Sequence, residues 1–252
     1  MKYTPKFFKD SMPEWKRKKD PLICRCFYRP ISFAVSALCT NLGISANSVS
    51  YFSAGVAIIG SAMLAWSNYV VNVWGAILIN IWLLLDCVDG NIARSVKKQP
   101  FGEFADALSS YILVGVMCSC IGINVFINGG LFTEKNNVLL LVIGILASES
   151  DTMMRLTHQK YLNTERELMD NGVIKEASKS LDGGHHGNRL NHIQEMLGVG
   201  GDLPLFILLA TIFHALDLIV IYCGVFYIGM GFVAILIYVR KAIRSAGSSD
   251  CK

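Results

Sequence analysis

The sequence predicts an all-α integral membrane protein with six transmembrane helices and an N-terminal amphipathic segment at the membrane interface. Hydrophobic residues make up 53% of the 252 residues and charged residues only 17%, and the mean hydropathy is positive. The apolar stretches reach about 20 residues, the length at which a helix crosses about 30 Å of hydrocarbon. Such a composition excludes an ordinary soluble domain.

Six apolar stretches are the predicted spans. Their approximate bounds are Asn47–Trp66, Tyr69–Ile92, Phe104–Ile127, Asn137–Tyr161, Leu203–Tyr222 and Val225–Val239. They divide the chain into an interfacial segment at 1–44, a six-helix membrane domain at 45–243 and a tail at 244–252. Within the domain, the stretch at about 162–201 is expected to be a long polar loop.

The N-terminal 29 residues mix cations with aromatic side chains. Residues 16–19 read Lys-Arg-Lys-Lys, and phenylalanine, tyrosine and tryptophan are interleaved with the other basic residues. This composition suits a segment on an anionic membrane face, and it would also suit a nucleic-acid patch. Because membrane spans follow, we expect membrane lipid as the partner and no nucleic acid.

Lysine and arginine are distributed unequally between the two ends of the spans. The joints within the span pairs one–two, three–four and five–six are short and nearly free of them, whereas the opposite ends carry them. The positive-inside rule then places both termini, the acidic stretch at 86–106 and the loop at 162–201 in the cytoplasm. We therefore expect an integral protein of a bacterial inner membrane or an equivalent membrane.

Acidic residues gather where the second predicted span ends and the third begins. Asp86 and Asp89 are three residues apart, which puts them on one face of a helix. Glu103, Asp106 and Ser110 share a face of the next helix, so a short turn between the helices can direct carboxylates at one point. Ionisable groups at membrane depth usually line a functional site. Hard oxygen ligands favour magnesium, manganese or calcium, and magnesium suits a phosphate-bearing substrate.

The residues of this motif resemble a known signature. D-C-V-D-G-N-I-A-R at 86–94, seven residues, and then G-E-F-A-D-A-L-S at 102–109 resemble the pattern D-x2-D-G-x2-A-R … G-x3-D-x3-D of the CDP-alcohol phosphotransferase family. The six-span layout is similar to that of the family as well. The stretch S-A-N-S-V-S at 45–50 resembles a relaxed form of the family's T-P-N-x-[VI]-T element before its first span.

The resemblance implies a site at which a CDP-linked donor meets an alcohol or lipid acceptor and CMP is released. Its product would be a phospholipid or a related phosphodiester, and the family implies a homodimer. By motif position, the ligands of two Mg²⁺ or Mn²⁺ ions would be Asp86, Asp89 and Asp106. The residues lining the CDP end would be Asn47, Gly90, Ala93, Arg94 and Gly102, with Arg94 near the phosphates.

The pattern departs from the family at Ser110, where the family has its last aspartate, and the spacer after Arg94 is one residue shorter. In the family this aspartate is a metal-site ligand and the expected general base. A serine hydroxyl cannot act as a base near pH 7 without an activator. Either another group serves, or base catalysis is dispensable, or the chemistry is lost. Glu103 is the nearest substitute; the other candidates are Glu149, Asp151, His185 and His186.

Three other functions fit parts of the same sequence. A non-catalytic family relative that binds nucleotide or lipid is the first alternative, because of Ser110. A transporter would also place acids in the membrane, but it should show an inverted repeat, and the sequence shows none. An intramembrane prenyltransferase uses aspartates with magnesium, but the D-G-x2-A-R element and its G-x3-D continuation argue against it.

Overall fold

The structure, a computed structural model, describes residues 2–173 and 198–249, and these ranges contain helices and no strands. The helices are α1 (Pro5–Asp10), α2 (Glu14–Lys19), the π-helical turn η1 (Cys24–Tyr28), α3 (Arg29–Asn41), α4 (Ala46–Leu64), α5 (Tyr69–Ser95), α6 (Gly102–Asn128), α7 (Val138–Asp170), α9 (Leu203–Ile212), α10 (Leu216–Cys223), the π-helical turn η2 (Gly224–Ile228) and α11 (Gly229–Ser249).

Four helices within the described ranges are long and apolar enough to cross a membrane. They are α4, α5, α6 and the continuous helix Leu216–Ser245, which comprises α10, η2 and most of α11. The all-helical membrane class is therefore supported, but the predicted number of six spans is not confirmed. Helix α7 has 33 residues, yet charged residues at 149, 151 and 155 interrupt its apolar part.

The predicted fifth and sixth spans need correction. Helix α9 has ten residues and is about 15 Å long, half of what a span needs. The helix is interrupted at His214, whose φ of 54° is left-handed. By contrast, the backbone stays helical through Cys223 and Gly224, where the sequence predicts the end of the fifth span. The sequence does not reveal this break because apolar residues lie on both sides of it.

Asp217 anchors the first turn of α10. Its carboxylate accepts hydrogen bonds from the backbone N–H groups of Leu131 (3.2 Å) and Phe132 (2.8 Å) and from the hydroxyl of Thr133 (2.7 Å). The side chain thus ties the start of α10 to the loop between α6 and α7. A buried carboxylate with several donors is satisfied, and no further ligand is needed to explain it.

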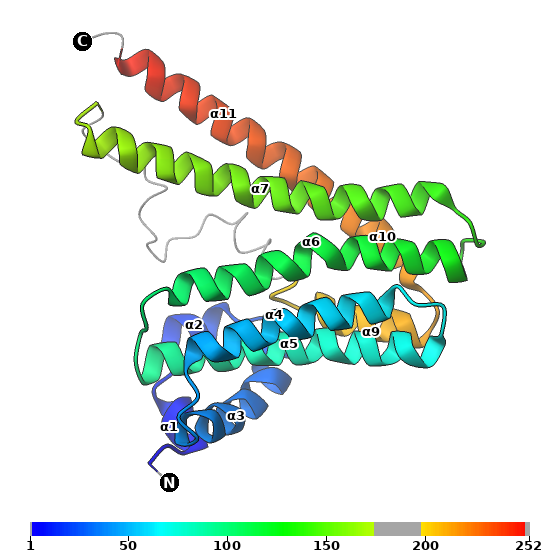
Figure 1. Ribbon diagram of the computed structural model, residues 1–252, viewed down its shortest axis with the longest axis horizontal. Helices are drawn as coiled ribbons and strands as arrows, with labels where there is room; N and C mark the ends of the chain where they lie inside the picture. The colour runs from blue at the N-terminus through cyan, green and yellow to red at the C-terminus, as the bar shows by residue number, and fades with distance from the viewer. Residues whose placement is uncertain (1, 174–197, 250–252) are drawn as a thin grey trace.

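Helix α4 is the common support of the two helices that carry the acidic motif. It packs against both α5 and α6, and the three helices lie side by side (Figure 1). Gly60 of α4 and Gly75 of α5 allow these two helices to pack very closely. A Cβ atom on Gly75 would lie 2.7 Å from the carbonyl oxygen of Gly60 and 2.8 Å from the backbone nitrogen of Leu64. Small residues allow such close packing between membrane helices.

The N-terminal helices form a second, smaller core beneath α5. Helix α3 packs against α5, and α1 packs against α3 (Figure 1). Phe8 of α1 and Phe33 of α3 are buried there with Val88 and Ile92 of α5. The predicted interfacial segment is therefore fixed against the end of α5 that bears the acidic motif.

We expect Gly75→Ala to lower the stability of the protein by about 1–3 kcal/mol, because the new methyl group meets backbone atoms that must move. The measurement is the thermal unfolding midpoint of the purified protein in detergent. Gly55→Ala is the matched control, since a Cβ atom at Gly55 of α4 has nothing within 4 Å. Equal midpoints for the two variants would contradict the close contact.

Candidate active site

Three carboxylates converge where α5 ends and α6 begins. Asp86 and Asp89 lie on α5, Asp106 lies on α6, and one ligand oxygen of each lies within 4.8 Å of the others. Asp86 is half-buried, Asp89 is buried and Asp106 is exposed, so the group is open on the side of α6. The structure thus brings together the three residues that the motif nominates as metal ligands.

Serines of α4 fix the buried part of this group. The hydroxyl of Ser50 donates a hydrogen bond of 2.6 Å to Oδ2 of Asp89. One turn further along α4, the hydroxyl of Ser53 lies 2.7 Å from that of Ser109, which also accepts a hydrogen bond of 2.8 Å from Nε1 of Trp82. All five side chains are buried. The hydrogen bonds join α4, α5 and α6 beside the carboxylates and hold Asp89 in one orientation.

The turn between α5 and α6 is held by Asn47. Its Nδ2 donates a hydrogen bond of 2.9 Å to the carbonyl oxygen of Pro100, and its Oδ1 is buried without a partner among the described residues. A Cβ atom on Gly102 would lie 3.4 Å from this Oδ1. Phe101, just before α6, has a φ of 58°, which is strained for a residue with a side chain. Asn47 and Gly102 are therefore neighbours, as the resemblance implies.

Three of the residues nominated for the CDP end, Gly90, Ala93 and Arg94, lie on the last turns of α5. The guanidinium of Arg94 folds back over Gly90, where a Cβ atom would lie 2.8 Å from Nη1. Arg94 is exposed, and its Nη2 donates a hydrogen bond of 3.4 Å to Oδ1 of Asn91. Ala93 is half-buried and packs against the small N-terminal core instead. Gly90 and Arg94 are thus adjacent, whereas Ala93 faces another part of the protein.

Ser110 and Glu103 occupy different environments on α6. Ser110 is half-buried, one turn after Asp106. The carboxylate of Glu103 is 86% exposed and lies 2.7 Å from Nζ of Lys98, at the surface of the turn. The group of converging carboxylates does not include Glu103. Its location removes the geometric support for Glu103 as a substitute base.

The other substitute bases also lie outside the carboxylate group. Asp151 of α7 is buried and ion-paired with Arg155, and the guanidinium of Arg155 lies 5.2 Å from the centre of the Tyr111 ring. Glu149 is exposed two residues before Asp151. His185 and His186 lie outside the described residues. None of the described candidates therefore takes the place of the missing aspartate.

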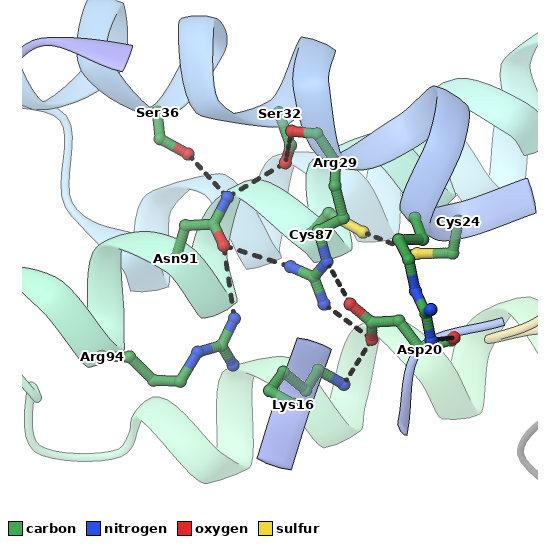
Figure 2. Close-up of polar contacts among 10 residues, drawn as sticks. Lys16, Asp20, Cys24, Arg29, Ser32, Ser36, Cys87, Asn91 and Arg94 are labelled. Carbon is green, nitrogen blue, oxygen red and sulfur yellow. Dashed lines mark hydrogen bonds and ion pairs between the residues drawn. The ribbon is translucent and has the colours of Figure 1, made fainter. Parts of the chain in front are cut away.

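A polar network beside α5 is a feature that the sequence reasoning missed (Figure 2). Arg29 forms two hydrogen bonds with Asp20, at 2.6 Å from Nε to Oδ2 and at 3.1 Å from Nη2 to Oδ1. Nη1 of Arg29 also donates a 3.1 Å bond to Oδ1 of Asn91. Nδ2 of Asn91 donates to Ser32 and Ser36 of α3. A signal was present in the sequence, because Arg29 and Asn91 are polar residues beside apolar runs.

Burial and the ion pair act in opposite directions on Asp20. Burial raises the pKa of its carboxyl, but the hydrogen bond and charge of Arg29, together with the charge of Lys16, outweigh burial. The pKa of Asp20 therefore lies below its ordinary value of 3.8. Burial likewise opposes the charged form of Arg29, but Asp20 outweighs it, so the pKa of Arg29 is raised. Both groups stay charged at neutral pH.

Comparisons with known proteins bear on this site. The family model for ceramide phosphoethanolamine synthase matches residues 30–175, more than half of the chain. A ceramide phosphoethanolamine synthase of Drosophila melanogaster is 32% identical over 94 residues, which are 37% of this chain and 24% of that enzyme. The match thus spans about a quarter of the length of the curated relative. The stretch matched by the family model contains the whole acidic motif but not Asp20 or Arg29.

We expect Asp20→Asn to destabilise the protein by about 3 kcal/mol at neutral pH, because Arg29 is left buried without its carboxylate. The folded-state pKa of Asp20 is lowered, so its contribution is complete above pH 3.8 and is lost as the pH falls through the folded pKa. The unfolding midpoints of wild type and variant should therefore approach each other as the pH falls below 3.8 and converge below the folded-state pKa of Asp20. A constant difference down to pH 2 would contradict this account.

Proposed function

This chain belongs to the ceramide phosphoethanolamine synthase family, and we propose that it is a metal-dependent membrane transferase using a CDP-linked donor. It would transfer the phospho-alcohol group to an alcohol acceptor and release CMP. The names of the family and of the Drosophila relative indicate phosphoethanolamine as the group and ceramide as the acceptor. The observation that carries the proposal is the convergence of Asp86, Asp89 and Asp106.

The donor set suits a hard divalent cation. Three carboxylates with ligand oxygens within 4.8 Å of one another repel unless positive charge lies between them. Their oxygen atoms match the preferences of Mg²⁺ and Mn²⁺, and Asp86, Asp89 and Asp106 would hold the ions. Divalent cations at such a site neutralise a diphosphate and stabilise the oxygen of the leaving group.

The proposed reaction is a displacement at phosphorus. The acceptor hydroxyl oxygen forms a bond to the phosphorus distal to cytidine, and the bond from that phosphorus to the bridging oxygen breaks. The electron pair of the broken bond leaves on CMP, and the hydroxyl proton passes to solvent or product phosphate. Arg94 is exposed beside Gly90, where its guanidinium can bind phosphate oxygens. Positioning and charge would supply most of the rate enhancement.

The residue at position 110 determines whether a general base can take the proton of the acceptor hydroxyl and so raise the rate. The hydroxyl of Ser110 lies one turn after Asp106 and can orient the acceptor by a hydrogen bond, but it cannot accept the acceptor's proton as a base near neutral pH. Glu103 is engaged with Lys98, and Asp151 is engaged with Arg155. We therefore propose turnover without a dedicated base, at a rate below that of an enzyme with aspartate at this position.

Two further features of the proposal concern the setting of the enzyme. The site would face the cytoplasm, because the cationic segments share its side of the membrane. A homodimer follows from the resemblance alone and stays a prediction. Within the part of the chain that the structure describes, four candidate spans support membrane insertion.

The test compares two carboxamide variants of the same helix. Asp106→Asn should lower CMP release from CDP-ethanolamine and ceramide by roughly 100-fold or more, because a ligand of the converging group is lost. Glu103→Gln should stay within about threefold of wild type, because Glu103 is exposed and lies outside the group. The assay is the release of radiolabelled CMP in detergent with Mg²⁺. Equal turnover by Asp106→Asn and wild type would contradict the metal site.

Ser110 favours one alternative, a non-catalytic relative that binds nucleotide or lipid. Ser110→Asp separates the two, because it restores the acid that the resemblance expects. Under our proposal wild type turns over and Ser110→Asp is faster, by up to about 10²-fold, the lower end of what general bases contribute. If Ser110→Asp releases CMP and wild type does not, the natural protein is a binding protein.

Ser50 should tune the site without contacting substrate. Ser50→Ala removes the hydrogen bond to Asp89, and we expect the affinity for Mn²⁺ to fall about tenfold. Ser48→Ala, an exposed serine two residues earlier on α4, is the matched control and should bind Mn²⁺ as wild type does. Titration followed by Mn²⁺ electron paramagnetic resonance measures both. Unchanged affinity in Ser50→Ala would show that Asp89 needs no support.

A further inference from the structure

The segment that precedes the family match is bonded, through Asp20, Arg29 and Asn91, to the end of α5 that carries the acidic motif. The family model begins at residue 30, so α2 and η1 fall outside it. Figure 2 shows Lys16 of α2 and Arg94 of α5 in the same polar network, in which Lys16 contacts Asp20 and Arg94 contacts Asn91. The network thus joins residues 16–29 to residues 91–94, which are more than 60 positions apart in the sequence.

The network is anchored by the buried ion pair of Asp20 and Arg29. Their side chains are only 3% and 6% exposed, and two hydrogen bonds join them. Arg29 reaches on to Oδ1 of Asn91, and the same oxygen accepts a hydrogen bond from Arg94. Two guanidinium groups therefore donate to one carbonyl oxygen. Arg29 is also paired with the carboxylate of Asp20, whereas Arg94 is not.

Lys16 is the second cation attached to Asp20. Its Nζ lies 3.3 Å from Oδ1 of Asp20, and its side chain is 28% exposed. Asp20 carries one negative charge and already pairs with Arg29, so the charge of Lys16 is not neutralised. Asp20, which is itself bonded to Arg29, thus holds Lys16 in the same polar network as Arg94.

Arg94 is the other cation without a neutralising partner. Within residues 2–173 and 198–249, no carboxylate lies at ion-pair distance from its guanidinium. The charges of Lys16 and Arg94 suit an anionic ligand, and the three carboxylates suit metal ions that such a ligand brings with it. A nucleoside diphosphate with its divalent cations has that composition.

We infer that Lys16 binds a phosphate of the nucleotide donor next to Arg94, and that Asp20 and Arg29 position Lys16 for this contact. The inference rests on the proposed function. It extends the substrate site to an N-terminal segment that the family match does not include. Lys16 would be a binding residue, whereas Asp20, Arg29 and Asn91 would act through it and through Arg94.

The experiment measures the binding of CDP and of cytidine to the full chain in dodecyl maltoside with Mg²⁺, by calorimetry. Lys16→Gln should raise the Kd for CDP about tenfold, as expected for the loss of a hydrogen bond to a charged group. Cytidine, which has no phosphate, should bind equally to both proteins. Lys16→Arg should retain CDP affinity within about threefold. Lys9→Gln, an exposed lysine of α1, is the control for segment charge and should change nothing.

The outcomes separate the two claims. If wild type binds CDP and Lys16→Gln binds it equally well, the role of Lys16 is wrong and the proposed function stands. If wild type does not bind CDP at all, the proposed function fails and the inference falls with it. Equal losses of CDP affinity in Lys16→Gln and Lys9→Gln would show that binding depends on the net charge of the segment and not on a contact of Lys16, and would overturn the inference. An effect seen in phosphatidylserine nanodiscs but not in maltoside would assign Lys16 to lipid headgroups and overturn the inference.

Discussion

Mutual repulsion of Asp86, Asp89 and Asp106 is the constraint on which the rest of the structure depends. At separations of 4.8 Å or less, each pair of ionised carboxylates would cost about 3.5 kcal/mol or more at an effective dielectric constant of about 20. The helices that carry the three groups must be held together against this cost. A cation between the carboxylates would turn the same arrangement into a net attraction, which is why a divalent ion is the simplest reason for its existence.

Helix α4 supplies the restraint. Its close contact at Gly60 brings α5 near, and its serines bond Asp89 and Ser109, so the site is built on helix ends and not on loops. The N-terminal segment adds a second restraint on α5 through the hydrogen bond from Arg29 to Asn91. Side chains fixed in this way are preorganised, and preorganised charge is what phosphoryl transfer requires of a protein.

The sequence predicted what depends on local register and missed what depends on contacts between distant segments. The spacing of Asp86, Asp89 and Asp106 and the short turn before Gly102 were sufficient to expect converging carboxylates. The bond from Ser50 to Asp89 joins residues 39 positions apart, and no periodicity encodes it. The break at His214 was missed as well; the hydrogen bonds of Asp217, three residues after it, join positions 85 and 86 residues apart, and no periodicity encodes them.

The most direct test of the central claim is anomalous scattering at the manganese edge from crystals of the full chain grown with Mn²⁺ and CDP. Our account predicts a manganese peak bounded by the carboxylates of Asp86, Asp89 and Asp106, with the diphosphate of CDP on its open side. A structure at saturating Mn²⁺ with no peak at this position, and with the three side chains turned to separate surfaces, would contradict it.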